Sequence, residues 1–287
     1  MNATTVLRGR GAEVLIGDEH PFVVIGERIN PTGRKKMTEQ ITTGDMTLVR
    51  ADALAQVAAG ARALDLNAGV PGFDEVEMLS NVVKAVLEVV DVPLCIDSST
   101  PAALEAAIPL VEGKVLINSV TAERESLERL LPLVARHGAA VIGIANDEEG
   151  PSMDPKVRLA AARKILEAAA EHGIAHEDVI IDVIAMPVGA AQDAATAMYE
   201  TIRLVRQELG VNVSCGASNI SFGMPGRHEI DAGFLTMAVQ AGMNTAITDP
   251  LHRPVRKALL ATDLLLGRDR FGGAWIADHR AEVAAPP

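Results

Sequence analysis

Short apolar runs of β-strand type alternate along the chain with longer segments in which apolar residues recur at helical spacing. Eight of these runs predict strands, at residues 22–26, 63–67, 93–97, 114–119, 139–145, 179–187, 212–219 and 245–250. A helix is expected after each strand, for example over residues 45–60 and 229–241 and from about Ala190. His-Gly or Ala-Gly pairs close several helices, because glycine adopts the left-handed conformation that ends a helix.

Eight strand-then-helix units predict an α/β fold of the (β/α)8 TIM barrel type. No Pro/Ser-rich linker divides the units, so residues 1–287 are interpreted as a single domain, with 1–20 as an N-terminal extension and 268–287 as a C-terminal tail. An open, doubly wound sheet is the alternative. It is disfavoured because the first strand-to-helix turn lacks a G-x-G-x-x-G phosphate loop.

Composition removes several classes of partner. The net charge is −12 and aromatic residues make up 2% of the chain, which argues against nucleic-acid binding, since that needs a basic surface and stacking platforms. No apolar run reaches the roughly 18 residues of a membrane span, and the N-terminus has no signal-peptide pattern. Cys95 and Cys215 lie in apolar runs without C-x-x-C spacing, as is typical of core thiols in a reducing cytoplasm.

Polar residues collect where the predicted strands end, and in a barrel these ends meet at the mouth that carries the active site. The residues are Glu27, Asn30, Asp65, Asn67, Asp97, Ser98, Asn118, Ser119, Asn146, Asp147, Asp182, Ser218, Asn219 and Asp249. Helix capping accounts for Ser98, Ser119 and Asn146. Asp97, Asn118 and Asp182 precede the expected caps, so we expect them at the mouth. Converging carboxylate and amide groups suit a heterocycle with amide and amino edges, such as a pterin or a purine, better than phosphate.

The stretch GERINPTGRKK, residues 26–36, places Glu27 and Asn30 before a Pro-Thr-Gly turn. A plain turn needs the proline and the glycine but not the charged group before them, which indicates a site. The basic run GRKK is interpreted either as a solvated turn or as a positive rim for an anionic tail or an acidic partner. No metal site is expected, because Gly173 interrupts the spacing of His172 and His176 at a helix end.

Six motifs, in order from about Phe22 to Leu266, resemble the pterin-binding methyltransferases: IGERINPTGRKK, ALDLNAG, PLCIDSST, LINSVTAERE, IIDVIAMP and GASNISFGMPGR. That family comprises the methyltetrahydrofolate:corrinoid methyltransferases and the folate-binding module of cobalamin-dependent methionine synthase. The resemblance implies a barrel that moves a methyl group between N5 of tetrahydrofolate and the cobalt of a corrinoid, in a direction left open. It also implies a homodimer, and a corrinoid (cobalamin) supplied by a partner protein, since the chain has no D-x-H-x-x-G motif.

The resemblance further implies a set of site residues. The folate pocket would comprise Glu27, Asn30, Asp97, Asn118, Asp182, Gly216, Ser218, Asn219 and Arg227. Asn219 and Asp182 would be catalytic, with Asn219 hydrogen-bonding the charge that develops at N5. Asp97 and Asp182 would hold the amino and ring N–H groups of the pterin and so fix its orientation.

Two features depart from the family pattern. Phe222 stands where some members carry Gln, which puts the contact near N5 in doubt, and no cysteine cluster is present to bind zinc and activate a thiol acceptor. Two alternatives remain open. One is a dihydropteroate synthase, disfavoured because the loop NAGVPGFDE is acidic where a pyrophosphate needs basic groups. The other is a folate-binding subunit without turnover.

Overall fold

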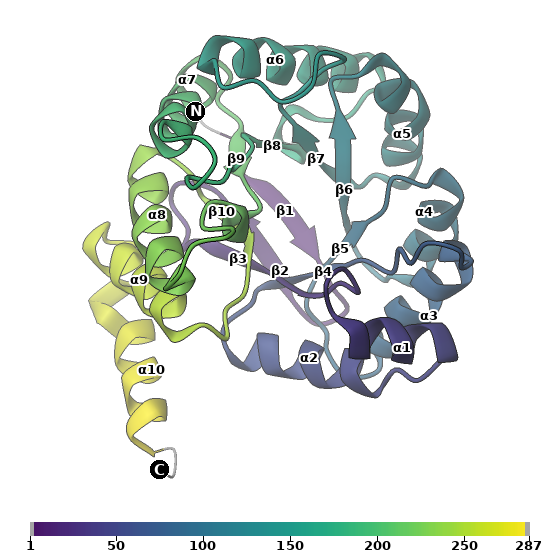
Figure 1. Cartoon of the computed structure of the whole chain (residues 1–287), viewed down its shortest axis with the longest axis horizontal. Coiled ribbons are helices and arrows are strands. Elements are labelled where there is room, and N and C mark those ends of the chain that lie inside the picture. Colours follow the sequence, from purple (N-terminus) through teal and green to yellow (C-terminus); the bar gives the residue numbers. More distant parts are fainter. Residues whose placement is uncertain (1–2, 285–287) are drawn as a thin grey trace.

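A parallel eight-stranded sheet forms the centre of the molecule in the computed structural model, which describes residues 3–284 (Figure 1). The strand order is β10-β3-β4-β5-β6-β7-β8-β9. The strands are β3 Val23–Ile29, β4 Ala63–Leu66, β5 Leu94–Asp97, β6 Leu116–Thr121, β7 Ala140–Ile144, β8 Val179–Asp182, β9 Asn212–Ser214 and β10 Thr245–Thr248. A parallel bridge between Gly216 and Ile247 joins the two ends of this order, so the sheet closes on itself. The predicted (β/α)8 barrel is confirmed.

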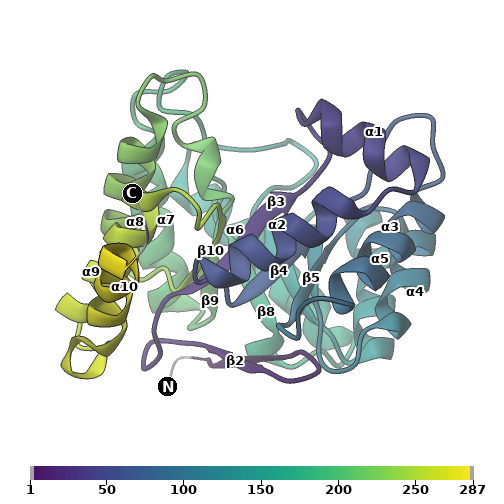
Figure 2. The same cartoon turned by 90° about the horizontal axis from the view of Figure 1, so that it is seen from below.

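Helices surround the sheet on its outer side (Figures 1 and 2). They are α1 Lys35–Thr43, α2 Thr47–Ala58, α3 Glu75–Leu87, α4 Pro101–Ala107, α5 Arg124–His137, α6 Pro155–Glu171, α7 Ala194–Glu208, α8 Arg227–Ala241, α9 Arg253–Leu265 and α10 Gly273–Ala284. The side chains of Asp74 and Asp154 cap the starts of α3 and α6. Gly138 ends α5 in the left-handed conformation, at φ 59°, as the His-Gly pair predicted. No helix in residues 3–284 is long and apolar enough to cross a bilayer.

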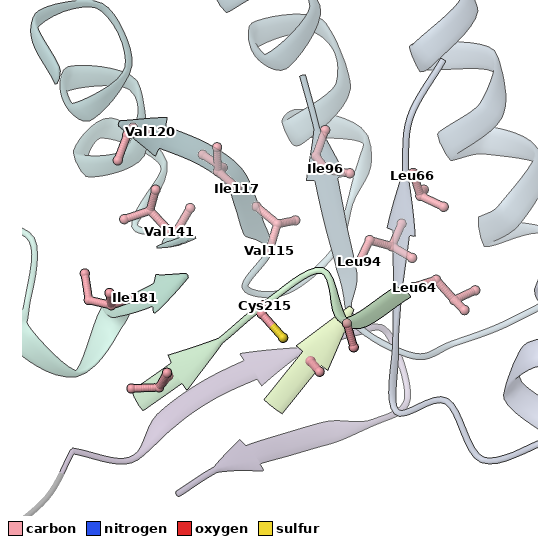
Figure 3. Close-up of a cluster of buried hydrophobic side chains, with 14 of the residues drawn as sticks. Leu64, Leu66, Leu94, Ile96, Val115, Ile117, Val120, Val141, Ile181 and Cys215 are labelled. Carbon is pink, nitrogen blue, oxygen red and sulfur yellow. The ribbon is translucent and has the colours of Figure 1, made fainter. Parts of the chain in front are cut away.

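Alternation along the strands divides the apolar side chains between two clusters. Outward-facing residues such as Leu64, Leu94 and Ile117 pack beneath the helices (Figure 3). Inward-facing residues fill the barrel, and Cys95 is one of them, fully buried as expected of a core thiol.

A short antiparallel hairpin closes the amino-terminal end of the barrel. It consists of β1 (Thr5–Arg8) and β2 (Glu13–Ile16) and lies across the base of the strands in Figure 2. Leu7, Val14 and Ile16 are buried in the same cluster as the inward-facing barrel residues. Residues 5–16 therefore seal this end with apolar surface and leave the opposite end free for polar groups.

The inward positions change from apolar to polar toward the carboxyl end of each strand. Val23 and Ile25 precede Glu27, Cys95 precedes Asp97, Leu116 precedes Asn118, and Ile180 precedes Asp182, each two residues apart. Because residues two apart in a strand point to the same face, these polar groups sit on top of the barrel core. The fold thus assembles a polar layer from several strands at one mouth.

Several boundaries differ from the sequence expectation. The predicted strand 179–187 ends at Asp182, and the predicted strand 212–219 ends at Ser214, followed by the 3-10 turn η3 Ala217–Asn219. Ile184 has a φ of +63°, which no strand contains, so the apolar residues after Asp182 line a loop and α7 starts at Ala194 instead of near Ala190. The GRKK run is a solvated turn only in part: Gly33 is exposed in the turn, while Lys35 and Lys36 are exposed on α1, a helix that was not predicted from the sequence.

Candidate active site

A cavity of about 590 Å³ opens at the carboxyl-terminal mouth of the barrel, within the usual size range of ligand sites. Its lining residues are Glu27, Arg28, Asn30, Thr32, Arg34, Asp65, Asp97, Asn118, Asp182, Gly216, Asn219, Arg227, Ile247, Asp249 and His252. Eight of the nine predicted site residues belong to this set. The ninth, Ser218, lies directly behind Glu27 and hydrogen-bonds it.

Two carboxyl groups and one amide form one side of the cavity, and a second amide, Asn67, supports it by a hydrogen bond. Asn118 Nδ2 donates to Asp65 Oδ1 at 3.1 Å, and Asn67 Nδ2 donates to Asp97 Oδ2 at 3.0 Å. Burial raises the pKa of Asp65, and the nearby charge of Asp97 raises it further. Burial also raises the pKa of Asp97, against the hydrogen bond from Asn67. Like charges this close disfavour double ionisation, so this side can present a proton donor beside a carboxylate acceptor.

Asp182 is held by backbone N–H groups. Its Oδ1 accepts a hydrogen bond of 2.7 Å from the N–H of Ile184, and the Gly216 N–H also donates to the carboxyl group. Burial raises the pKa of Asp182 to about 6, while these two hydrogen bonds and the charge of Arg158 act to lower it. At neutral pH the group is therefore mainly an oriented carboxylate.

Glu27, at the end of β3, lines the same cavity as Asp182. Ser218 Oγ donates to Glu27 Oε1 at 2.6 Å, and Arg227 Nη2 donates to the Ser218 carbonyl at 2.6 Å. Burial raises the pKa of Glu27 to about 7, and the charges of Asp249 and Asp231 add to the rise. A carboxyl group with this pKa exchanges a proton readily near neutral pH.

Asn219 extends from the loop after β9 and is exposed to the cavity. Within the described chain its side-chain amide has no hydrogen-bond partner, so both its donor and its acceptor remain available. A Cβ atom at Gly216 would lie 3.1 Å from Asn219 Nδ2, which explains why a glycine stands there. Asn30 differs, because its Oδ1 already accepts a hydrogen bond of 2.9 Å from Thr32 N and closes the turn.

Arginine side chains form the remaining wall. Arg28 belongs to the charged group that indicated a site and Arg34 to the basic run, but neither was predicted as a site residue. Arg28 Nη1 lies 2.8 Å from Asp249 Oδ2, and Arg34 Nη1 lies 2.6 Å from Asp52 Oδ2. The Arg34 guanidinium is thus ion-paired inside the mouth, although its backbone N–H closes the turn by donating to Pro31 O. Asp52 belongs to α2, and no motif around it indicated a partner for the turn.

Other strand-end residues lie outside this cavity. Ser98 is not the helix cap that was expected: Thr100 is the N-cap of α4, without a side-chain capping hydrogen bond, and Ser98 Oγ accepts a hydrogen bond of 3.0 Å from the Thr100 N–H in the turn before the helix. Ser119 lines a separate polar hollow, and Phe222 is 67% exposed on the loop before α8. Over residues 3–284, no group of three or more His, Cys, Asp or Glu side chains is arranged to hold a metal ion.

Comparison with known proteins adds three kinds of match. Residues 26–249 match the family model described as pterin binding enzyme. The chain is 32% identical to a methylcorrinoid:tetrahydrofolate methyltransferase of Eubacterium limosum, over 87% of this chain and 93% of that protein. It is 28% identical to a methionine synthase of Mycobacterium tuberculosis, over 86% of this chain and 22% of that longer protein.

Solved structures of dihydropteroate synthases share the architecture. The enzyme from Stenotrophomonas maltophilia superposes with a TM-score of 0.71 at 21% identity, covering 91% of this chain and 98% of that one. The enzyme from Thermus thermophilus gives a TM-score of 0.65 at 24% identity, covering 91% of this chain and 99% of that one. At these identities the similarity demonstrates a common fold.

Proposed function

The chain belongs to the pterin binding enzyme family, and from this premise we propose that it is a methyltransferase that moves a methyl group between N5 of tetrahydrofolate and the cobalt of a corrinoid. The observation that carries the proposal is the convergence of Asp97, Asn118, Asp182 and Asn219 on one cavity, in a chain 32% identical to a methylcorrinoid:tetrahydrofolate methyltransferase. Tetrahydrofolate or methyltetrahydrofolate is the folate substrate, and the corrinoid (cobalamin) is the second substrate.

The donor and acceptor pattern of the cavity fits a pterin. A pterin presents amino and ring N–H donors next to a carbonyl acceptor, which require carboxylates and an amide together. Asp97 and Asp182 supply the carboxylate oxygens, and Asn118 supplies an amide that both donates and accepts. Because Asp65 and the backbone N–H groups already hold these side chains, the pocket is oriented before the ligand arrives.

Asn219 is the residue we assign to N5. Breaking the N5–methyl bond leaves negative charge on the pterin, and a hydrogen bond from the Asn219 amide stabilises it. An amide provides no net proton, so N5 gains its proton from water or through the carboxyl network of the cavity. In the opposite direction the same groups accept the proton that N5 releases, as microscopic reversibility requires.

The corrinoid, we propose, is carried by a partner protein that approaches the open mouth of the barrel. We also propose a homodimer, supported by exposed apolar side chains around the hollow between α7, α8 and α9, where Met237 is 56% and Leu265 is 83% exposed. A cytoplasmic location is proposed because both cysteines are buried free thiols, which suits a reducing compartment.

Methyl transfer between methyltetrahydrofolate and free cob(I)alamin, followed by absorbance, tests the function. We expect turnover by the wild type and a loss of at least about 100-fold in Asn219→Ala and Asp182→Asn, since removal of one stabilising donor typically costs that much. Asp91→Asn is the matched control, because Asp91 is an exposed residue at the amino-terminal end of the barrel, ion-paired with Arg10.

The other outcomes identify the alternatives. Folate binding without transfer, even with a reduced corrinoid protein, would indicate a binding subunit. Condensation of a pterin pyrophosphate with an aminobenzoate would identify a dihydropteroate synthase. Absence of folate binding would overturn the proposal.

A further inference from the structure

Arg158, in the first turn of α6, is completely buried, with 0% of its surface exposed. In the part of the chain that the structure describes, no carboxylate lies within ion-pair distance of it. Its guanidinium instead donates to backbone carbonyls, from Nε to Ser152 O at 2.5 Å and from Nη1 to Val183 O at 2.7 Å and Ile184 O at 3.1 Å. A buried arginine without a paired carboxylate is costly, so its position demands a specific role.

The carbonyls that Arg158 binds belong to the residues directly after Asp182. Ile184 has a φ of +63°, a left-handed conformation that a β-branched residue adopts only under backbone strain. In this conformation the N–H of Ile184 points back to Asp182 Oδ1, at 2.7 Å. The Val183 and Ile184 carbonyls point the other way, toward the guanidinium. One short segment is therefore held between Arg158 on the outside and Asp182 at the cavity.

We propose that Arg158 is a positioning residue for the folate site: by binding the carbonyls of Val183 and Ile184, it holds the strained loop that orients the Asp182 carboxyl group into the cavity. The proposal rests on the proposed role of Asp182 as a folate ligand. Through Ser152 O the same guanidinium also ties this loop to the loop after β7, so two neighbouring loops of the mouth share one anchor. The planar arginine fork suits such divergent acceptors better than a lysine ammonium would.

Arg158 also acts on Asp182 through its charge. The cation lowers the pKa of Asp182, which burial raises to about 6. Loss of the cation is therefore expected to raise the pKa of Asp182 further. Folate binding that needs the Asp182 carboxylate would then fail at a higher pH than in the wild type.

The test compares Arg158→Met, Arg158→Lys and a matched control, Arg206→Met. Arg206 is an equally large buried arginine, 8% exposed, that binds the Val211 carbonyl at 2.6 Å and pairs with Asp18 away from the cavity. Methyltetrahydrofolate affinity is measured by calorimetry from pH 5 to 9. The Asp182 carboxyl is titrated in parallel by carbon-13 NMR, with its signal identified by its loss in Asp182→Asn.

In Arg158→Met we expect the pH below which folate affinity is lost, and the NMR titration midpoint of Asp182, to rise by about one pH unit. This is the low end of the effect of a nearby opposite charge on a pKa. Arg158→Lys keeps the charge, so the pH at which affinity is lost should not change, while affinity at pH 8 falls about 10-fold because the guanidinium hydrogen bonds are lost. Arg206→Met should leave both the affinity and the pH at which it is lost unchanged, although it destabilises the fold.

A folded Arg158→Met with wild-type affinity and an unmoved Asp182 midpoint overturns the proposal. If Arg158→Met does not fold, Arg158→Lys decides, because unchanged affinity in that folded variant also contradicts the positioning role. If the wild type itself binds no folate, the proposed function fails separately, and the NMR titration still reports whether Arg158 acts on Asp182.

Discussion

Ser218 Oγ and Glu27 Oε1 lie 2.6 Å apart and join the first strand of the barrel to the loop that follows the seventh. Among the described residues, Ser218 is the one hydrogen-bond donor to this carboxyl group. Burial and two further carboxylates, Asp249 and Asp231, raise the pKa of Glu27 to about 7 against this hydrogen bond. The cavity therefore holds a group whose charge changes near neutral pH, next to the loop that carries Asn219.

The raised pKa of Glu27 predicts a pH-dependent stability. Between pH 4.5 and 7 the folded protein keeps a proton that the unfolded chain has released, so this group lowers the free energy of unfolding as pH rises through 7. Glu27→Gln removes the effect and keeps the acceptor for Ser218. We expect the difference in unfolding free energy, variant minus wild type, to increase by about 3 kcal/mol from pH 4.5 to about pH 8.

Urea unfolding at both pH values measures this gain. Glu39→Gln, at an exposed position on α1, is the control and should show no such change. Equal stability differences at the two pH values for Glu27→Gln would contradict the raised pKa.

Asp65 and Asp97 should respond differently to the same substitution. Asp65 is 3% exposed, and its raised pKa means that it is already protonated, so Asp65→Asn is expected to change folate affinity less than about threefold. Asp97 is half-buried at the cavity, and Asp97→Asn replaces a cavity-lining carboxyl oxygen by an amide NH2 group, at a cost of about 10- to 100-fold in affinity. Calorimetry with methyltetrahydrofolate separates the two cases. A larger loss in Asp65→Asn would show that its carboxylate form binds the ligand.

Gly216 keeps room for the Asn219 side chain, and Gly216→Ala should disturb it. The Cβ would lie 3.1 Å from Asn219 Nδ2, while the backbone at Gly216 has a φ of −74° that alanine adopts freely. We therefore expect unchanged thermal stability and methyl transfer slowed at least about 10-fold, because a small displacement of a catalytic group is costly. Gly233→Ala, on α8 with no neighbouring atom within 4 Å of the new Cβ, is the control and should retain the full rate.

Alternation along the strands made much of this site predictable. Asp97, Asn118 and Asp182 each follow an apolar inward residue by two positions, so a barrel places them on one layer whatever the loops do. Asp65 follows Ala63 by the same interval and was identified as a strand-end residue. The resemblance did not include it among the ligands, although the structure places it in the cavity wall.

Contacts between distant segments could not be predicted in the same way. Arg34 pairs with Asp52 on α2, and Arg158 binds carbonyls 25 and 26 positions later in the chain, with no local pattern that indicates either contact. Ile184 has strong strand propensity, yet the hydrogen bonds to Asp182 and Arg158 impose a left-handed conformation on it. Tertiary contacts here override local preference.

The GRKK run offers an internal comparison of buried and exposed cations. Arg34→Ala leaves Asp52, which is 7% exposed, with Arg28 as its remaining ion-pair partner at 3.6 Å, so we expect a loss of about 2–3 kcal/mol of unfolding free energy. Lys36→Ala, at an exposed position in the first turn of α1, should lower the unfolding free energy by less than about 0.5 kcal/mol. Chemical denaturation of both variants at neutral pH gives the comparison. Equal losses of unfolding free energy in the two variants would show that the ion pair of Arg34 with Asp52 contributes no stability.

The hairpin at the base of the barrel should contribute to stability without contributing to the site. Leu7 is fully buried against the inward-facing barrel residues, so Leu7→Ala removes apolar contacts and leaves a cavity, at a cost of about 2–5 kcal/mol. The hairpin lies at the opposite end from the folate cavity, so affinity for methyltetrahydrofolate should stay within about twofold of the wild type under conditions where the variant is folded. Leu265→Ala, on a side chain 83% exposed, is the control and should leave the unfolding free energy of the monomer nearly unchanged. A fall in folate affinity that parallels the loss of stability in Leu7→Ala would instead mean that packing at the base of the barrel controls the geometry of the polar residues at its mouth.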